Sequence, residues 1–299
     1  MNKPPVPEED CKPAFCRTGS ENPCHFRRAG QFQDRSGLIG EVEVWRCSQC
    51  GLGVSRPPLP DPSLLYTDRT SADFQPRMGA AEYSIKSYVF RRAARRLLAD
   101  LPEDPAVIVD VGCGSGLFTR CMADECKSGH VVGMDFHAMP PSFLDASQYL
   151  PFERASDLSG GADVVLAFHV LEHDDDPLGL LDRITALLRP GGRLVIEVPN
   201  IDCLWAGVFG PYWDAWYLPY HRSHFSGRSL RTLLQAGGLI IEDENDICLP
   251  TMGRTMSNLF GRRAPALFFL LGILLHPAQW IGEKISRRPS ALRVIARKP

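Results

Sequence analysis

The sequence lacks the features that define several large classes of protein. Its opening residues, MNKPPVPEED, hold no apolar stretch, so we expect no secretory signal and a cytoplasmic location. No apolar run is long enough to span a bilayer, because the best candidate, residues 264–282, is interrupted by His276, Pro277 and Gln279. An excess of one charge is also absent: 33 Lys and Arg face 35 Asp and Glu, which argues against a general affinity for nucleic acid. With 44% hydrophobic and 23% charged residues, the 299-residue chain has the composition of a globular protein.

Cysteine is present, but it is unevenly distributed. Five of the ten Cys residues lie within the first 50 positions, and without export their thiols should stay reduced, so the cluster predicts metal binding rather than disulfides. The run Cys47-Ser48-Gln49-Cys50-Gly51 is typical of a zinc knuckle, in which glycine lets the chain turn around the ion. Tetrahedral zinc needs a second pair of ligands, for which we predict Cys11 and Cys16. Cys24 is an alternative to either of these two. The predicted ligands are Cys11, Cys16, Cys47 and Cys50.

The chain divides into five predicted segments. A zinc-binding module (1–56) is followed by a proline-rich linker (57–83), a large domain (84–250), a basic and apolar helical insertion (251–290) and a last strand (291–299). Within the large domain, apolar runs that suit buried strands alternate with amphipathic helices, which predicts a doubly wound, mostly parallel α/β sheet. The predicted strands cover 106–111, 130–135, 152–155, 162–168, 193–198, 239–247 and 292–296, and the predicted helices cover 84–100, 117–127, 177–188 and 226–236.

A glycine-rich turn follows the first strand of the large domain. In the run 109–116, VDVGCGSG, glycine lets the backbone turn sharply and approach a ligand at the N-terminus of the following helix. Asp135 ends the next strand, where a carboxylate can accept hydrogen bonds from both ribose hydroxyls. Leu117 stands where a dinucleotide fingerprint needs a glycine, so the spacing indicates a different nucleotide-bearing ligand. The alternative is a tight turn in a protein that binds its cofactor elsewhere.

At this point the sequence resembles the class I S-adenosylmethionine-dependent methyltransferases. The segments VDVGCGSG, VVGMD, ADVVLAFHVLEH, LLRPGGRLVIEVPN and HFSGRSLRTLLQAGG look like the successive motifs of that family, in the same order, across residues 84–247. The resemblance implies a seven-stranded sheet and S-adenosylmethionine as the cofactor. It also implies which residues bind the cofactor: Asp110 with Gly112, Cys113, Gly114 and Gly116 at its methionine end, Asp135 at the ribose, Phe136 and Asp157 at the adenine, and Phe168 with His169 beside the sulfonium.

Four histidines lie in two short clusters, the first of which follows the strand where the methyl group would emerge. Histidine can act as a general base near neutral pH, so we expect His173, His221 or His224 to deprotonate or orient the acceptor. The alternative is that these histidines hydrogen-bond the loops around the cofactor. Some relatives with similar segments bind a divalent metal, for which Glu172, His173 and His224 are the candidates here, with His169 where those relatives have Glu.

Two further stretches leave alternatives open. Seven aromatic residues between 205 and 220 suit either a lid that stacks on a ring-shaped acceptor or a hydrophobic flap packed on the domain. The segment 251–299 carries nine Lys and Arg against one Glu, although the rest of the chain is acidic. Its apolar part, 259–285, suits peripheral contact with anionic lipid at the inner face of a membrane, or else packing on the sheet or a dimer contact.

The acceptor is the least specified part of the prediction. One branch of the class I methyltransferases, which the sequence resembles, carries an N-terminal zinc module that ends in a segment like RCSQCGLGVSRPPLP. This branch includes enzymes that methylate sugars. We therefore expect methyl transfer from S-adenosylmethionine to a small molecule, a sugar or a lipid-linked glycan. The alternatives are an RNA or protein methyltransferase that docks through the zinc module, and a non-catalytic scaffold on a methyltransferase fold. The sequence predicts no oligomeric state.

Overall fold

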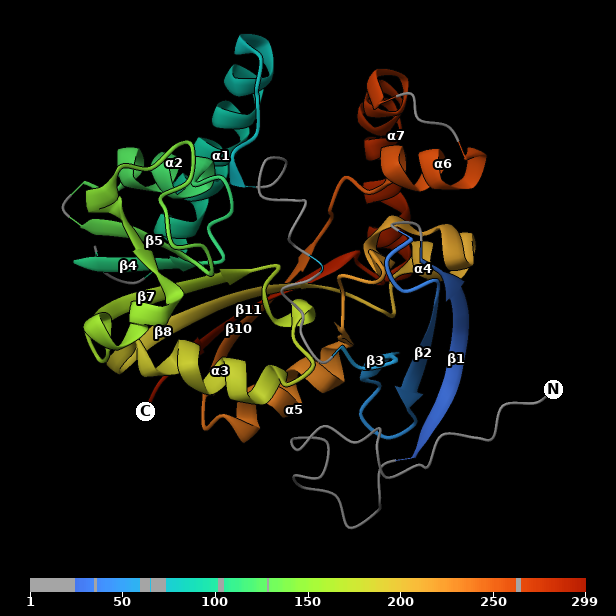
Figure 1. The fold of residues 1–299 in the computed structure, drawn as a ribbon, viewed down its shortest axis with the longest axis horizontal. Coiled ribbons are helices and arrows are strands. Elements are labelled where there is room, and N and C mark those ends of the chain that lie inside the picture. Colours follow the sequence, from blue (N-terminus) through green and yellow to red (C-terminus); the bar gives the residue numbers. More distant parts are fainter. Residues whose placement is uncertain are drawn as a thin grey trace.

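The structure is a computed structural model that describes residues 25–34, 37–59, 65, 74–101, 105–127, 129–261 and 265–299. The predicted zinc ligands Cys11 and Cys16, and the alternative Cys24, lie outside the described residues. Figure 1 shows a large sheet flanked by helices, with a smaller sheet beside it.

The large sheet has seven strands in the order β10-β11-β8-β7-β4-β5-β6. Neighbouring strands from β8 to β6 pair in parallel, whereas β11 is antiparallel to both β8 and β10. The predicted doubly wound, mostly parallel sheet of seven strands is thus confirmed. The strands are β4 (Val107–Val111), β5 (His130–Asp135), β6 (Tyr149–Pro151), β7 (Ala162–Phe168), β8 (Leu188–Pro199), β10 (Ile240–Ile247) and β11 (Ala291–Arg297).

Helices cover both faces of this sheet because its central strands are apolar on both sides. Along β4, Ile108 packs in a core to which α1 and α2 contribute, whereas Val109 packs in the core to which α3 and α5 contribute. Figure 1 shows these two pairs of helices on opposite faces. Burial on both faces explains why the central strands are continuous apolar runs rather than alternating ones. The helices are α1 (Ala80–Asp100), α2 (Leu117–Glu125), α3 (Pro177–Ala186) and α5 (Gly227–Ala236).

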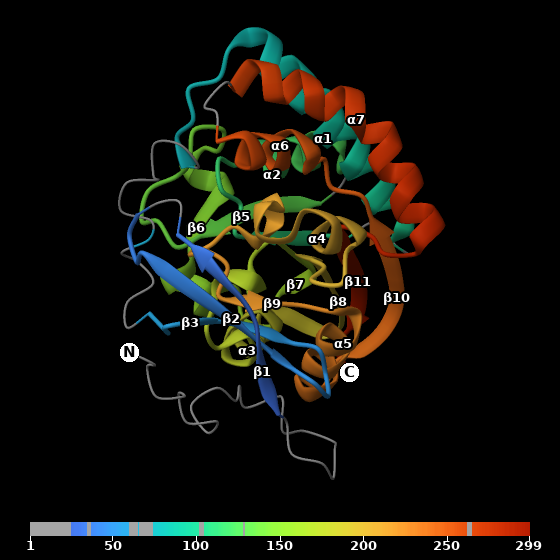
Figure 2. The same ribbon diagram turned by 90° about the vertical axis from the view of Figure 1, so that its right-hand side faces the viewer.

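The small sheet joins the N-terminal segment to the large domain. β1 (Phe26–Gln33), β2 (Glu41–Cys47) and β3 (Gly53–Arg56) pair successively in antiparallel fashion, and β3 also pairs with β9 (Ser223–His224). Because β9 belongs to the segment 84–250, the residues predicted as a separate module share a sheet with the large domain. Figure 2 shows this sheet lying across the end of the molecule that faces the viewer.

Two helices fill the predicted insertion between the last two strands. α6 (Met252–Phe260) packs closely on α7 (Pro265–Ser286), since a Cβ on Gly253 would lie 2.3 Å from the carbonyl oxygen of Phe268. Figures 1 and 2 both show α1 and α7 projecting from the same side of the large sheet. In the part of the chain that the structure describes, no helix combines the length and the apolarity needed to cross a membrane.

The third strand was predicted at the wrong place. The structure has β6 at Tyr149–Pro151, and the predicted range 152–155 falls in a 3-10 segment in which Phe152 is buried. Pro151 has no N–H to continue the ladder, so the strand ends there and the apolar Phe152 is buried beyond it. The remaining short elements are α4 (Leu204–Phe209) and 3-10 turns at Ala146–Gln148, Phe152–Leu158, Leu171–His173, Gly210–Tyr212 and Asp214–Trp216.

Candidate active site

The glycine-rich turn lies between β4 and α2, where the sequence predicts it. Gly112, Gly114 and Gly116 have φ angles of 72°, 53° and 80°, a left-handed backbone that other residues rarely adopt. Space is short as well, because a Cβ on Gly112 would lie 2.5 Å from Val170 Cγ2 and one on Gly116 would lie 2.5 Å from Leu144 Cγ. The turn therefore needs glycine, and it brings backbone N–H groups to the N-terminus of α2 at the carboxyl end of the parallel strands.

Asp135 ends β5 next to this turn. Its Oδ2 accepts a hydrogen bond from the N–H of Gly114 (2.9 Å), and its Oδ1 accepts one from the N–H of Phe136 (2.7 Å). Burial raises the pKa of the Asp135 carboxyl, while these hydrogen bonds and the charges of His137 and His173 oppose that rise. The carboxylate is held in place by two donors, and each oxygen keeps a lone pair for a hydroxyl group.

Phe136 offers an open aromatic ring beside Asp135. The residue is 55% exposed, and its ring centroid lies 4.6 Å from that of the buried Phe152. A supported ring with one open face suits contact with a purine base. Asp157, predicted at the same base, is exposed and pairs with Arg154 at 2.7 Å. No hydrogen bond within the described ranges connects Asp157 to the glycine-rich turn.

Asp110 lies on β4 and is buried just before the turn. Thr119 Oγ1 donates a hydrogen bond to Asp110 Oδ2 at 2.6 Å. Burial raises the pKa of Asp110 to about 7; the bond from Thr119 opposes this rise, and the charge of Asp135 adds to it. Burial and the same two carboxylates raise the pKa of the Cys113 thiol, which therefore stays protonated. The structure thus brings Asp110, Cys113 and Asp135 together around the turn.

A charged network that the sequence analysis did not predict connects the ends of β7, β8 and β11. His169 places its Nδ1 3.1 Å from Glu172 Oε1 and its Nε2 3.2 Å from Glu197 Oε1. Arg293 donates to Glu197 Oε2 from Nε (2.9 Å) and Nη2 (2.6 Å), and its guanidinium lies 5.1 Å from the centroid of the Phe168 ring. Burial opposes a charge on the imidazole, but hydrogen bonds to Glu172 and Glu197 outweigh it and raise the pKa of His169 to about 10.

The sequence did contain a feature that pointed to this network. Glu197 interrupts the apolar strand RLVIEV, and Arg293 interrupts the apolar strand LRVIA. A charge inside a buried strand needs a partner, because an unpaired buried charge is costly. His169 adds a second feature, since its φ of 57° is a left-handed conformation that residues with side chains adopt mainly where the surroundings enforce it.

The three histidines predicted as general bases lie together but differ in their surroundings. The ring centroids of His173 and His221 are 4.8 Å apart. His221 donates from Nδ1 to the carbonyl oxygen of Ala215 (3.0 Å), and burial holds the pKa of His221 well below its usual value. His224 Nε2 lies 2.9 Å from Ser55 Oγ, and burial lowers the pKa of His224 to about 3. His173 is the least buried of the three.

A known family matches this arrangement. A family model described as a methyltransferase domain matches residues 85–244, which is more than half of the chain. The chain belongs to the class I methyltransferase family. The match covers β4, β5 and β7 together with the turn that contains Gly112, Gly114 and Gly116.

Curated relatives of this family member match it over part of their length. The ubiquinone biosynthesis O-methyltransferase of Aeromonas salmonicida is 29% identical over 157 residues, which cover 47% of this chain and 65% of the relative. The trans-aconitate 2-methyltransferase of Azoarcus sp. is 37% identical over 117 residues, which cover 36% of this chain and 46% of the relative. The chain thus spans less than two thirds of the length of either relative.

A solved structure shows the same fold. The 1,6-didemethyltoxoflavin-N1-methyltransferase of Burkholderia thailandensis superposes with a TM-score of 0.50 at 20% sequence identity. The alignment covers 84% of this chain and 96% of that one. At this identity the likeness concerns the fold alone.

The structure does not bring the predicted metal ligands Glu172, His173 and His224 together as one set. Potential ligand atoms of Glu172, His173 and His221 lie within 4.8 Å of one another, whereas His224 contacts Ser55 of the small sheet. The prediction is therefore wrong in its third member. Glu172 Oε1 already pairs with the His169 imidazole at 3.1 Å.

Cys47 ends β2 and Cys50 lies in the turn before β3, and both side chains are buried. The N–H of Gln49 donates to Cys47 Sγ at 3.4 Å, and the N–H of Gly51 donates to the carbonyl oxygen of Cys47 at 3.0 Å. Gly51 has a φ of 78°, so glycine makes the turn as predicted. Backbone N–H groups directed at cysteine sulfur suit a metal-bound thiolate, so the turn fits one half of a zinc site.

Part of the aromatic stretch 205–220 packs on the domain, since Tyr220 is buried whereas Tyr212 is 40% exposed. Trp213 is buried, and its ring centroid lies 5.7 Å from that of Trp216. Trp216 lies 5.0 Å from Phe32 of β1, measured between ring centroids. Trp205 Nε1 donates to Glu283 of α7 at 3.0 Å. The stretch therefore links the small sheet to α7.

Proposed function

We propose that this chain transfers a methyl group from S-adenosylmethionine to a small-molecule acceptor. The observation that carries the proposal is the meeting of the glycine-rich turn with Asp135, whose carboxylate is fixed by Gly114 and Phe136 and keeps lone pairs for ribose hydroxyls. When bound, the cofactor supplies an electrophilic methyl group, and its S–C bond breaks as the bond to the acceptor forms. The family match and the methyltransferase names of the relatives support the same activity.

The task of the chain's own residues is to hold the two reactants in line. Asp135 binds the ribose and Phe136 covers the adenine. The turn and Asp110 bind the methionine end: its carboxyl group meets N–H groups at the N-terminus of α2, and its ammonium group meets the Asp110 carboxylate. Held in this way, the cofactor would present its methyl group near Phe168 and His169 at the end of β7.

An acceptor that loses a proton needs a base, and His173 is the best-placed candidate among the three histidines. His173 follows the end of β7 in the 3-10 turn Leu171–His173 and is the least buried of the three, which supports a position open to the acceptor. His221 is buried, and its ring packs edge-on against that of His173, so it serves to position His173. His224, bonded to Ser55, serves to attach the small sheet.

A small molecule is the acceptor class that the relatives favour, since two of them are named for ubiquinone biosynthesis and for trans-aconitate. Sugars and lipid-linked glycans fall within this class.

Peripheral contact with anionic lipid through residues 259–285 belongs to the same proposal, because Phe260, Leu270 and Leu274 are exposed there. Co-flotation of the intact protein with anionic vesicles, reduced by Leu274→Glu, is the expected result; failure of the intact protein to co-float would contradict the lipid contact.

Titration calorimetry with S-adenosylmethionine tests the function. The intact protein is expected to bind the cofactor with a Kd on the order of micromolar, and Asp135→Asn is expected to bind at least about tenfold more weakly because it loses a charged acceptor. Asp182→Asn is the matched control, since Asp182 is exposed on α3 and is not among the predicted cofactor residues, and it should bind like the intact protein. Absence of binding by the folded intact protein would overturn the proposal.

Structural zinc is the second part of the proposal, supported by the turn around Cys47 and Cys50. Purified protein is expected to contain one zinc ion per chain, and Cys47→Ser should lose it together with thermal stability. Cys126→Ser, outside the small sheet, is the control and should retain the metal. Zinc-free intact protein, or full zinc content in Cys47→Ser, would contradict this part.

A further inference from the structure

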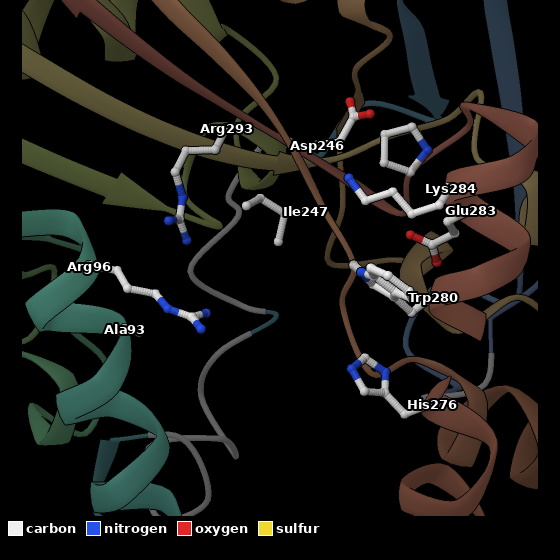
Figure 3. A pocket seen from close by; sticks show the side chains of 11 residues that line it. Ala93, Arg96, Asp246, Ile247, His276, Trp280, Glu283, Lys284 and Arg293 are labelled. Carbon is white, nitrogen blue, oxygen red and sulfur yellow. The ribbon is translucent and has the colours of Figure 1, made fainter. Parts of the chain in front are cut away.

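Two helices, α1 and α7, project from the same side of the large sheet (Figures 1 and 2). Each runs towards the sheet, since α1 is followed by β4 and α7 by β11, so their N-terminal halves are the outer ends. Near the sheet a cavity of about 330 Å³ separates the two helices, with Arg96 of α1 on one wall and Trp280 and Lys284 of α7 on the other (Figure 3). At this level neither helix covers the other.

The outer half of α1 is exposed and rich in apolar side chains. Every residue from 79 to 86 is exposed. The only charges between residues 80 and 89 belong to Glu82 and Lys86, which pair with each other at 2.7 Å. Four large apolar or aromatic side chains are 41–66% exposed on this half: Tyr83, Ile85, Tyr88 and Val89. An exposed cluster of this kind marks a contact surface.

The exposed face of α7 is apolar as well. Between residues 265 and 282 the chain carries no Asp, Glu, Lys or Arg. The exposed side chains of this stretch include Leu267, Leu270, Ile273, Leu274 and Trp280. The shorter α6, which packs on α7, adds the exposed Leu259 and Phe260. Most of the large apolar side chains that the described residues expose therefore lie on α1, α6 and α7.

Cations without partners follow these apolar halves on both helices. Arg92 and Arg96 lie on the inner half of α1, Lys284 lies in the last turn of α7, and Arg287 lies just beyond it. All four side chains are exposed, and among the described residues none of them has an ion-pair or hydrogen-bond partner. The surface thus has two layers, with apolar groups at the outer ends and unpaired cations nearer the sheet.

This layering matches the boundary of an anionic bilayer. Apolar helix faces enter a bilayer by about 5–10 Å, Lys and Arg meet the anionic headgroups, and Tyr and Trp favour the level between them. Each cation can bind a separate headgroup, so cations on opposite walls need not converge on one anion. A second copy of the chain fits less well, because a two-fold interface through this face would bring the unpaired cations of both copies together.

We propose that α1 and α7 together form a membrane-docking face that binds an anionic bilayer. The outer halves of both helices insert among the lipids, and Arg92, Arg96, Lys284 and Arg287 bind the headgroups. The proposal rests on the lipid contact proposed above for residues 259–285, and it adds α1 as a second point of contact. Two contacts fix the orientation of the protein on the membrane, whereas one helix alone leaves the protein able to turn about that helix.

Co-flotation with vesicles of phosphatidylglycerol and phosphatidylcholine tests the role of α1. The intact protein should co-float, and Ile85→Gln/Val89→Gln should partition at least about tenfold more weakly, because two apolar side chains no longer enter the lipid. Ile85→Leu/Val89→Leu keeps apolar groups at both positions and should retain binding. Ile240→Gln is the matched control, since Ile240 is exposed on β10 outside the docking face, and it should bind like the intact protein. Vesicles of phosphatidylcholine alone should bind the intact protein more weakly.

Full co-flotation of Ile85→Gln/Val89→Gln, together with loss in Leu274→Glu, would overturn this inference and leave the lipid contact of α7 standing. Failure of the intact protein to co-float would overturn both. Equal binding to vesicles without phosphatidylglycerol would overturn the role of the cations. Self-association in analytical ultracentrifugation that Ile85→Gln/Val89→Gln abolishes, without co-flotation, would assign the face to a second copy instead.

Titration with S-adenosylmethionine separates this inference from the proposed methyl transfer. Ile85→Gln/Val89→Gln should bind the cofactor like the intact protein, because the outer half of α1 holds none of the residues assigned to the cofactor. Co-flotation without cofactor binding by the intact protein would defeat the methyl transfer and leave the docking face standing.

Discussion

Asp110 couples cofactor binding to pH at the scale of a single residue. Burial raises its pKa to about 7, although Thr119 donates a hydrogen bond to it. The ionised carboxylate is the form that binds an ammonium group, so the affinity for S-adenosylmethionine should rise roughly fivefold to tenfold between about pH 6 and pH 7.5. Calorimetry at several pH values measures this. Asp110→Asn should bind more weakly and with a flatter pH profile; the same slope in both proteins would contradict the role of Asp110.

His169 makes the stability of the folded protein depend on pH. Its stabilising contribution falls as the pH rises, whereas the cofactor affinity that depends on Asp110 rises. Its folded-state pKa of about 10 lies above the usual value, so its stabilising contribution is complete below about pH 6.5 and is lost as the pH rises through about 10. The difference in Tm between the intact protein and His169→Gln should therefore become smaller as the pH rises over this range. The effect is weakened because the His169 side chain is partly exposed to solvent. The exposed His130→Gln is the control, and its gap should stay constant. A His169→Gln gap independent of pH would show that the imidazole is not charged.

Residues whose position depends on the local chain could be predicted, and residues that meet across strands could not. Gly112 and Asp135 follow from a turn and a strand end within short segments of sequence. His169, Glu197 and Arg293 come from the ends of β7, β8 and β11, and they meet because Phe168 is in register with Glu197, which is in register with Arg293. No local pattern specifies that register.

At the scale of elements, the buried parallel strands were the most predictable part of the fold. The predicted ranges 130–135 and 162–168 match β5 and β7 at both ends, because burial on both faces makes such strands continuous apolar runs. The range 152–155 was wrong because an apolar residue can also be buried in a 3-10 segment, as Phe152 is. β9 has two residues and depends on its pairing with β3, so no run of apolar residues in the sequence predicts this strand.

The capping box of α5 contributes to stability at this scale. Ser226 Oγ accepts a hydrogen bond from the N–H of Ser229 (3.1 Å) and lies 2.9 Å from the carbonyl oxygen of Cys50, to which it donates. Ser226→Ala should therefore lower the free energy of unfolding by about 2 kcal/mol, since a cap and a buried hydrogen bond are lost together. Urea denaturation measures the change. The exposed Ser159→Ala is the control, with an expected change below about 0.5 kcal/mol, and an equally small change in Ser226→Ala would contradict the role of the cap.

At the scale of the whole molecule, the small sheet and the large domain share a buried polar contact. Arg222 is 0% exposed, and its Nη2 donates to the carbonyl oxygens of Ser55 (3.1 Å) and Pro57 (2.6 Å). Its Nε donates to Asp175 of the large domain at 3.1 Å. A guanidinium buried between two parts of the chain needs acceptors from both, because an uncompensated buried charge costs several kcal/mol. The predicted boundary after residue 56 therefore separates partners of one contact.

Removal of residues 1–56 tests whether the large domain folds by itself. The chain 57–299 loses β1, β2 and β3, and with them the partner strand of β9 and the Ser55 acceptor of Arg222, so its free energy of unfolding should fall by about 3–5 kcal/mol or its cooperative transition should disappear. Circular dichroism during thermal melting measures this. Asp202→Asn in the full chain breaks only the exposed pair with Arg46 (2.6 Å) across the same contact, and it should cost less than about 1 kcal/mol. A truncated chain that melted cooperatively near the full-length Tm would show that Arg222 finds other acceptors and that residue 56 ends an independent module.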